Sequence, residues 1–589
     1  MKWFSLLLAP SILAAASLAQ DAKIMRSYDL EDFRLVEDEG RTFSMSYFVP
    51  WVFYDFEDKS KLPREMTGND YVVDALEGLL EPMLSDHGAE LRVLSDSRLV
   101  VSGSQAVHEA VESLLGRLRS IVTATYEVRV DLVKWDTALG AEALPKSMMS
   151  AGEADAFIAS ARQNGARVRT LTGPCQPGAT ATFDASKASS YLADFDVEIA
   201  SHSMIADPIV MHLEHGQRLM LRLSPGAEGV NAAYYLSSRD LLEITRLPVQ
   251  MNGRMGIDPE TPVVISSGQN PFAVPQQTPV TPPTKTGVVE GPSFIEAPVV
   301  RTHSVGGEAA LAVGGALCLS SSFDYAGKTS TDVVIVRLVG DSSNVQSWTV
   351  LEEQSQAKVT AINLLRFSPA RIDFEGLPSS QISQLNDQAG YGDVDVSFRR
   401  PDFDWVIEEM SQGLRLMSWS GSWAFVRVDP NWHPDAASNY ALLKSLPADR
   451  DVSDLTLDCT GLGRAALRLP VASNGSFGAS VGLHMAKVAD YHVEVAQGSS
   501  VADPYVFREF SGVQMGGRLS GDSIRTSGFA QWTETDKRSV DIAGGIMGPI
   551  QMSEVRRVDL NERRVVADGA PETYGQAAEG GTSVRIVRR

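Results

Sequence analysis

Residues 197–210 read VEIASHSMIADPIV, and residues 493–506 read VEVAQGSSVADPYV. Eight of the fourteen positions are identical, two more exchange valine for isoleucine, and the two stretches lie 296 residues apart. Both stretches are rich in β-branched residues, which is typical of strands. Asp-Pro near the end of each stretch predicts a turn that ends the strand, because proline fixes φ and cannot donate a ladder hydrogen bond.

The correspondence continues at the same spacing beyond the quoted stretch. The further matches are Ala193-Asp194 with Ala489-Asp490, Gly216 with Gly512, and Arg222-Leu223-Ser224 with Arg518-Leu519-Ser520. Val336-Arg337 matches Val587-Arg588 at a shorter spacing, and a segment with eight prolines, residues 259–292, supplies most of the difference. A constant register over so many residues predicts a duplicated β-rich domain. The glycine pair is expected to form a hairpin turn in each copy.

The N-terminus and the net charge bear on location and partners. Residues 1–19, MKWFSLLLAPSILAAASLA, combine Lys2, an apolar run and small residues at Ser17 and Ala19. This pattern predicts a signal peptide cleaved after Ala19, and the run is shorter than the ~20 residues that a membrane-spanning helix needs. The net charge of −22 and the scattered Lys and Arg residues argue against nucleic acid as a partner. We therefore expect an exported protein.

Residues 20–120 are expected to form a small α+β module. The segment 104–120, SQAVHEAVESLLGRLRS, carries apolar residues at helical spacing, and Ser104 is the expected N-cap. Strands are expected at 91–94 and 98–101, and a second helix at 69–81. Two antiparallel β-domains follow: repeat 1 at 121–345, then a connecting region at 346–415, then repeat 2 at 416–589.

The Pro-rich segment 259–292 lies within repeat 1. Prolines at this density exclude a central strand, so we expect an exposed, partly extended insertion. Recognition of this segment by a protein partner stays open as the alternative, since the composition supports both.

The residues that could carry chemistry do not form a catalytic or metal-binding pattern. Cys175, Cys318 and Cys459 are too few for a disulfide framework or a zinc site, so buried thiols are favoured, while one bridge plus a free thiol stays open. HLEH at 212–215 lies in an alternating segment, where side chains three apart face opposite sides of a strand. The tryptophans Trp419 and Trp423 are expected to pack in a core or on a sheet face rather than to stack on sugars. We predict no catalytic, cofactor-binding or metal-binding residue.

Taken together, the segments resemble bacterial secretins, the ring-forming outer-membrane proteins of type II and type III secretion. The residues that carry the resemblance are YDLEDF near the start, LRVLSDSRLVVSGSQAVHEAVESLLGRLRS in the module, and the two series VEIA…ADPIV…GQRLMLRLS and VEVA…ADPYV…GVQMGGRLS. The V-P-x-L-G-D-I-P-like segment at the gate of secretins has no counterpart here, so the resemblance does not extend to a gate. It implies a location in the periplasm or at the outer membrane, and protein partners or self-association.

Two hypotheses follow from the sequence. The first is an exported, non-enzymatic, secretin-like structural or assembly protein of the bacterial envelope, related to protein secretion. The second is an exported enzyme or carbohydrate-binding protein with a site between the two β-domains. The fold class expected under both is β-rich α+β: a small α+β module followed by two copies of an antiparallel β-domain.

Overall fold

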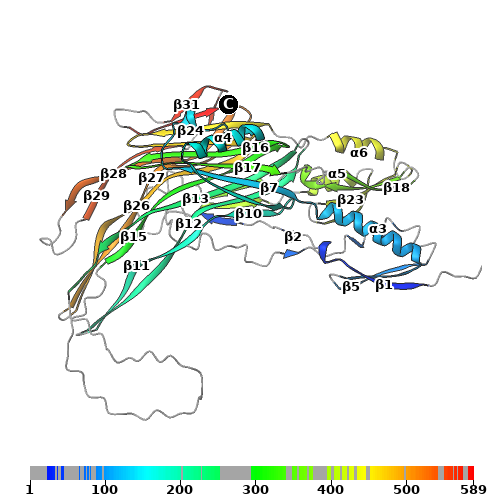
Figure 1. Cartoon of the computed structure of the whole chain (residues 1–589), viewed down its shortest axis with the longest axis horizontal. Helices are drawn as coiled ribbons and strands as arrows, with labels where there is room; N and C mark the ends of the chain where they lie inside the picture. The colour runs from blue at the N-terminus through cyan, green and yellow to red at the C-terminus, as the bar shows by residue number, and fades with distance from the viewer. Residues whose placement is uncertain are drawn as a thin grey trace, which may run out of the picture.

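The computed structural model describes most of residues 88–252, 294–367 and 394–589, together with 23–33, 371–375 and short stretches between residues 36 and 80. Two antiparallel sheets lie face to face, and a smaller α+β part lies at one end of them (Figure 1). The expected β-rich α+β class with a duplicated β-domain is confirmed. The signal peptide 1–19 and the insertion 259–292 lie outside the described residues. None of the described helices has the length and apolar character needed to cross a membrane.

The first sheet, here called the long-strand layer, contains strands of up to 23 residues. Its order is β10-β12-β13-β15-β26-β27-β28-β29, with β11 also paired to β12, β14 to β27 and β30 to β28. The bounds are Thr180–Asp184 (β10), Lys187–Ala200 (β11), Ser203–Pro225 (β12), Gly229–Pro248 (β13), Gln250–Asn252 (β14), Phe294–Ala312 (β15), Ser476–Ala496 (β26), Ser499–Ser520 (β27), Ser523–Val540 (β28), Ile550–Asp559 (β29) and Arg563–Val565 (β30).

The second sheet, here called the short-strand layer, has the order β31-β32-β24-β25-β16-β17-β7-β9, with β8 paired to β16. The bounds are Tyr126–Trp135 (β7), Met148–Ser150 (β8), Arg167–Cys175 (β9), Gly315–Tyr325 (β16), Lys328–Val339 (β17), Val452–Thr460 (β24), Arg464–Ala472 (β25), Pro571–Tyr574 (β31) and Ser583–Arg588 (β32). Helix α4, Ala151–Gln163, covers its outer face and begins with a capping box between Ser150 and Glu153.

The duplication predicted from the sequence is visible in the strand pairing. β10 and β11 together cover residues 180–200, and β26 covers the same positions 296 residues later. The hairpin β11–β12 has a register shift between Leu192 and Asp194, and the hairpin β26–β27 has one between Val488 and Asp490. Each repeat therefore contributes four consecutive strand positions to the long-strand layer.

The short-strand layer divides in the same way. The first repeat supplies β9-β7-β17-β16, and the second supplies β25-β24-β32-β31. The match of Val336-Arg337 to Val587-Arg588 falls on β17 and β32, which occupy equivalent places in the two halves. The molecule is thus a two-layer sandwich made of two four-plus-four units side by side.

Two local predictions at the repeat are wrong. Asp207-Pro208 does not end a strand, because Pro208 lies inside β12 opposite Phe195 of β11. In the described pairing, β11 is the only strand beside β12 at this point. The missing N–H of Pro208 therefore interrupts no hydrogen bond to a second neighbouring strand. Gly216 and Gly512 are not hairpin turns either; they lie inside β12 and β27 with φ of +131° and +147°. At both sites the neighbouring strand passes too close for a Cβ atom.

The main core fills the space between the layers. Alternate residues of the long strands point inward, as the period of two predicts, and meet inward residues of the short-strand layer. Leu221, Tyr234 and Met515 from the first layer and Leu319 and Leu467 from the second are each at most 1% exposed. Burial of a side chain of this size stabilises a fold by ~1.5–3 kcal/mol.

The N-terminal module forms much as the sequence predicts. β1 (Ile24–Asp29), β5 (Glu90–Ser95) and β6 (Arg98–Gly103) form one sheet, and α3 spans Gln105–Val122. Ser104 occupies the N-cap position, but its side chain makes no capping hydrogen bond. The described residues within the expected helix 69–81 are helical, and Val73, Leu76 and Leu80 are buried.

A second α+β unit lies between the two repeats in the sequence and beside the N-terminal module in space (Figure 1). Its sheet has the order β18-β19-β23-β22, and its helices are α5 and α6. The bounds are Trp348–Gln354 (β18), Ala357–Asn363 (β19), Asp404–Ser411 (α5), Arg415–Ser420 (β22), Trp423–Val428 (β23) and Ala436–Ser445 (α6). Because 415–428 pairs within this sheet, we propose that the second repeat begins at β24 instead of residue 416.

Five further short strands form two small sheets. They are β2 (Val36–Glu37) with β4 (Glu65–Met66), and the sheet of β3 (Thr42–Met45), β20 (Arg371–Glu375) and β21 (Val394–Arg399).

Candidate functional site

The two histidines of HLEH point to opposite sides of β12. Ser190 Oγ lies 2.8 Å from His212 Nδ1, and Ser189 Oγ lies 2.8 Å from His215 Nε2. Successive residues of a strand face opposite sides, so these contacts separate the histidines. Burial lowers the pKa of His215, and the nearby Lys187 lowers it further. Within the part of the chain that the structure describes, no group of three His, Cys, Asp or Glu side chains is arranged to hold a metal ion.

The three cysteines are buried and unbridged. Burial raises the pKa of Cys175 and of Cys459 to about 12 and also raises that of Cys318, which lies under α4. A thiol with so high a pKa is protonated at neutral pH and is a poor nucleophile.

Under the carbohydrate-binding hypothesis, sugar would stack on the tryptophans or bind between the two repeats. Where the structure describes these two regions, side chains fill them. Trp423 is 5% exposed and lies in the core shared by the N-terminal module and the inserted sheet; the side chain of Trp419 lies outside the described residues. Between the repeats, the Tyr234 hydroxyl donates to the Pro470 carbonyl oxygen at 2.5 Å. A Cβ atom on Gly307 would lie 2.8 Å from the same hydroxyl, so this part of the junction is filled.

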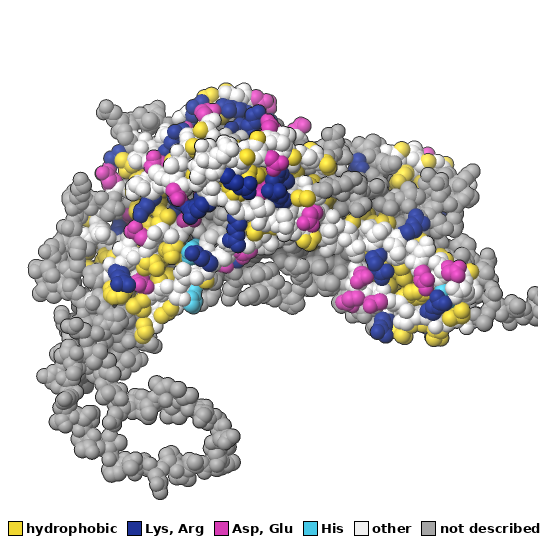
Figure 2. Space-filling view, in the orientation of Figure 1, with side chains coloured by type: hydrophobic (Ala, Val, Ile, Leu, Met, Phe, Trp, Pro, Cys, Tyr) yellow, Lys and Arg dark blue, Asp and Glu magenta, His cyan; other side chains and the backbone are white. Residues whose placement is uncertain are grey.

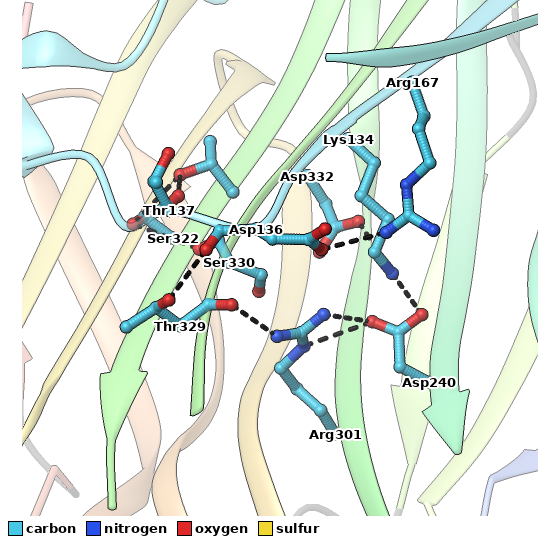
Figure 3. A network of polar contacts seen from close by, with 11 residues as sticks. Lys134, Asp136, Thr137, Arg167, Asp240, Arg301, Ser322, Thr329, Ser330 and Asp332 are labelled. Atoms are coloured by element: carbon cyan, nitrogen blue, oxygen red, sulfur yellow. Dashed lines mark hydrogen bonds and ion pairs between the residues drawn. The ribbon is translucent and has the colours of Figure 1, made fainter. Parts of the chain in front are cut away.

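A polar network joins the two layers inside the first repeat (Figure 3). Asp240 of β13 accepts hydrogen bonds from Arg301 Nε at 3.1 Å and Arg301 Nη2 at 2.6 Å, and it also accepts from Lys134 Nζ of β7. Lys134 Nζ lies 3.5 Å from Asp332 Oδ1 of β17. Arg301 Nη1 donates to the Thr329 carbonyl oxygen at 2.9 Å. Two cations and two carboxylates thus connect β13 and β15 of one sheet with β7 and β17 of the other.

Burial and charge act in opposite directions on the two carboxylates of this network. Burial alone would raise the pKa of Asp240, but Lys134 and Arg301 more than offset it and hold that pKa below its ordinary value. Asp332 is more deeply buried, with its side chain 4% exposed, and burial raises its pKa. Of the two carboxylates, Asp240 is therefore the one whose negative charge the two cations stabilise more strongly.

Two members of the network have no charged counterpart at the positions that the strand register equates in the second repeat. Arg301 corresponds to Met552 and Asp332 to Ser583 in the second repeat, 251 residues later. The charges are therefore not needed to form the repeat fold. They fasten the layers of one unit by connecting β13 and β15 with β7 and β17.

Two buried histidines lie beside the line where the repeats meet. Burial lowers the pKa of His303 and of His484 to about 3, so both are neutral at physiological pH. His484 packs against Phe510 with ring centroids 5.0 Å apart, and neither ring nitrogen of His303 has a hydrogen-bond partner. Their neutral state is a consequence of burial.

A shallow hollow lies at the break between β10 and β11. Arg218, which lines it, is held by Asp184 at 2.6 Å and Glu214 at 2.8 Å. These charges satisfy one another, so the hollow contains no group that demands a ligand.

Backbone strand pairing joins the two repeats in both layers. In the long-strand layer β15 pairs with β26, from Val300 opposite His484 to Gly307 opposite Phe477. In the short-strand layer β16 pairs with β25, from Ser320 opposite Arg468 to Asp324 opposite Arg464. Both sheets therefore continue without interruption from one repeat into the other.

The outer ends of the sandwich present strands that are paired on one side only among the described residues. At the first-repeat end these strands are β9 and β10–β11, and at the second-repeat end they are β31 and β29. On β29, Met552 is 46% and Val555 is 50% exposed. Figure 2 shows apolar side chains gathered over the region of β11 and β12, where Ile209, Val210 and Met211 are exposed. Strand order is not encoded in local residue patterns, so no sequence pattern predicts these edges.

No family model and no curated protein matches this chain. Among solved structures, the secretin InvG of the Salmonella SPI-1 type III secretion injectisome is 11% identical, covering 54% of this chain and 87% of that one with a TM-score of 0.22. The InvG secretin-domain β-barrel is 9% identical over 76% of this chain and 88% of that chain, with a TM-score of 0.17. The type II secretion system secretin GspD of E. coli K12 is 8% identical over 74% and 63%, with a TM-score of 0.17. These likenesses are remote in sequence and in superposition.

Proposed function

We propose that this chain is an exported, non-enzymatic structural protein of the bacterial envelope that acts by assembling with other protein chains in a secretion-related role. The observation that carries the proposal is the joint between the repeats, in which strand pairing continues two sheets across two independent units. A protein built by edge-to-edge addition of sandwich units, whose end strands are paired on one side only among the described residues, is suited to form a wall.

The sequence supports the location and the class of protein. The N-terminal pattern predicts export, and the module at 20–120 together with the repeated strand series resembles secretins. The described part of the site adds buried thiols, neutral buried histidines and ion pairs that satisfy one another, and these groups serve packing.

The test is the state of the mature protein in its cell and in solution. Cell fractionation should recover it with the envelope, and light scattering with negative-stain electron microscopy should find particles much larger than one 63.7-kDa chain. A protein that stays monomeric up to high micromolar concentration and fractionates without membrane would contradict the proposal. A hydrolytic or sugar-binding activity of the pure protein would favour the alternative of a site between the repeats.

A further inference from the structure

At each end of the sandwich the outermost strands are paired on one side only within the described part of the chain, and these two ends are equivalent to the two sides of the internal joint. β29 occupies in the second repeat the place that β15 occupies in the first, and β10–β11 occupies the place of β26. In the other layer β31 corresponds to β16, and β9 corresponds to β25. The second-repeat end therefore presents β29 and β31. Their counterparts in the first repeat, β15 and β16, are the strands that pair with the second repeat.

We propose that copies of this chain add head to tail by repeating the internal joint. β29 of one copy pairs antiparallel with β10–β11 of the next, and β31 of the first copy meets β9 of the next in the short-strand layer. This inference rests on the proposed assembly function and names its partner, a second copy of this chain. One chain then supplies two wall units, and the contact is heterologous, because the two edges that meet are different.

The internal joint also fixes the register of the contact between copies. Tyr235 pairs with Gly306 in the first repeat, and the equivalent Gln531 pairs with Arg557, so β15 and β29 correspond at a spacing of 251 residues. β10–β11 and β26 correspond at 296. Transferring the joint of residues 300–307 with 477–484 therefore sets residues 551–558 of one copy against 181–188 of the next. In this register Met552 lies opposite Lys187.

The side chains on the two edges have complementary charges in that register. Glu554 lies opposite Ala185 and diagonal to Lys187 on the same face. Arg557 lies opposite Thr182 and diagonal to Asp184 on the other face. Diagonal neighbours across an antiparallel pair are ~7–8 Å apart at their Cα atoms, within reach of long side chains, and opposite charges there favour pairing.

The inward-facing positions of the edges also match. Ala181 and Phe183 of β10 pack on the main core, and Val558 of β29 packs on the same core at the far end. The register sets Val558 opposite Ala181, so the core between the layers continues into the next copy. An edge with both signs of charge discourages pairing with unrelated strands, while a complementary edge is accepted.

Site-specific disulfide crosslinking in the full chain tests the register. Lys187 and Met552 are exposed, and the three native cysteines are buried. Lys187→Cys and Met552→Cys variants, co-expressed and oxidised, should give a covalent dimer, whereas each variant alone should give none because the contact is heterologous. A chain with both substitutions should give a ladder of higher multimers. The matched control replaces Met552→Cys with Val558→Cys, which lies on the same face about 20 Å along the strand and should not crosslink.

A charge exchange gives a second readout that needs no new disulfide. Glu554→Lys alone and Lys187→Glu alone should each weaken association about fivefold, and the double exchange should restore it. Assemblies that form normally but give no crosslink from the matched pair, or equal crosslinking from the Val558→Cys control, would overturn the register and leave the assembly function standing. A crosslink from either single variant alone would show a symmetric contact and overturn the head-to-tail arrangement. A chain that is monomeric under all conditions would refute both proposals.

Discussion

Replacing Asp240 with alanine is expected to destabilise the sandwich far more than replacing an acidic residue of a surface ion pair. Asp240 accepts from Arg301 at 2.6 and 3.1 Å and from Lys134, and the side chains of these two cations are only 6% and 15% exposed. Asp240→Ala leaves both cations buried without their main counter-ion. Asp136 is the matched control, because it pairs with Arg167 at 2.8 Å while both side chains are at least 69% exposed.

The size of the effect follows from burial. Removing one partner of a buried ion pair costs ~3–5 kcal/mol, because an uncompensated charge stays inside. Asp332 lies 3.5 Å from Lys134 and compensates part of its charge. The loss of unfolding free energy for Asp240→Ala is therefore expected near the lower end of this range, about 3 kcal/mol. An exposed pair contributes ~0–1 kcal/mol, so Asp136→Ala should lose less than about 1 kcal/mol.

Urea denaturation followed by far-UV circular dichroism measures both losses in the full chain. The substitutions hardly change the surface exposed on unfolding, so the slopes should be equal and the shift in midpoint reports the change in unfolding free energy. Equal losses for the two variants, or a loss below ~1 kcal/mol for Asp240→Ala, would refute the reasoning that this network is a buried fastening between the layers.

Three further outcomes are expected. The pKa of His303 is lowered to about 3 from 6.5. Between these pH values the unfolded chain binds a proton that the folded chain does not, so the free energy of unfolding falls as the pH falls. His303→Leu should remove up to about 1.4 kcal/mol per pH unit from this pH dependence, as thermal unfolding from pH 7 to 4 would show. Gly216→Ala and Gly512→Ala should each cost at least ~1–3 kcal/mol in urea, while Gly116→Ala in α3, where a Cβ meets nothing within 4 Å, should gain ~0.5–1 kcal/mol. The buried thiols should resist alkylation in the native protein and react after denaturation, as mass spectrometry would show; alkylation of the folded chain would contradict their burial.

Local sequence patterns predicted the elements that are specified by neighbouring residues or by a strict apolar period. The apolar stripe of α3 required no knowledge of partners, and the helix forms within two residues of the expected bounds 104–120. The errors at Asp207-Pro208 and Gly216 have one physical cause. In a strand of 23 residues the neighbours change along its length, so a proline or glycine fits mid-strand where one side lacks a partner or a second strand crosses closely.

The duplication of a β-rich unit is evident from the sequence without a structure, because matching residues recur at a constant spacing of 296 positions. The sequence did not indicate that residues 415–428 pair in a separate sheet that packs against the N-terminal module. The alternation of a strand shows which of its faces is apolar, but not which other element packs on that face. It also could not place Lys134 beside Asp240, 106 residues away, or show that β29 and β10–β11 remain at open edges. Strand order and layer packing depend on burial between segments distant in the sequence, so the positions of the joint and of the described edge strands follow from the tertiary structure alone.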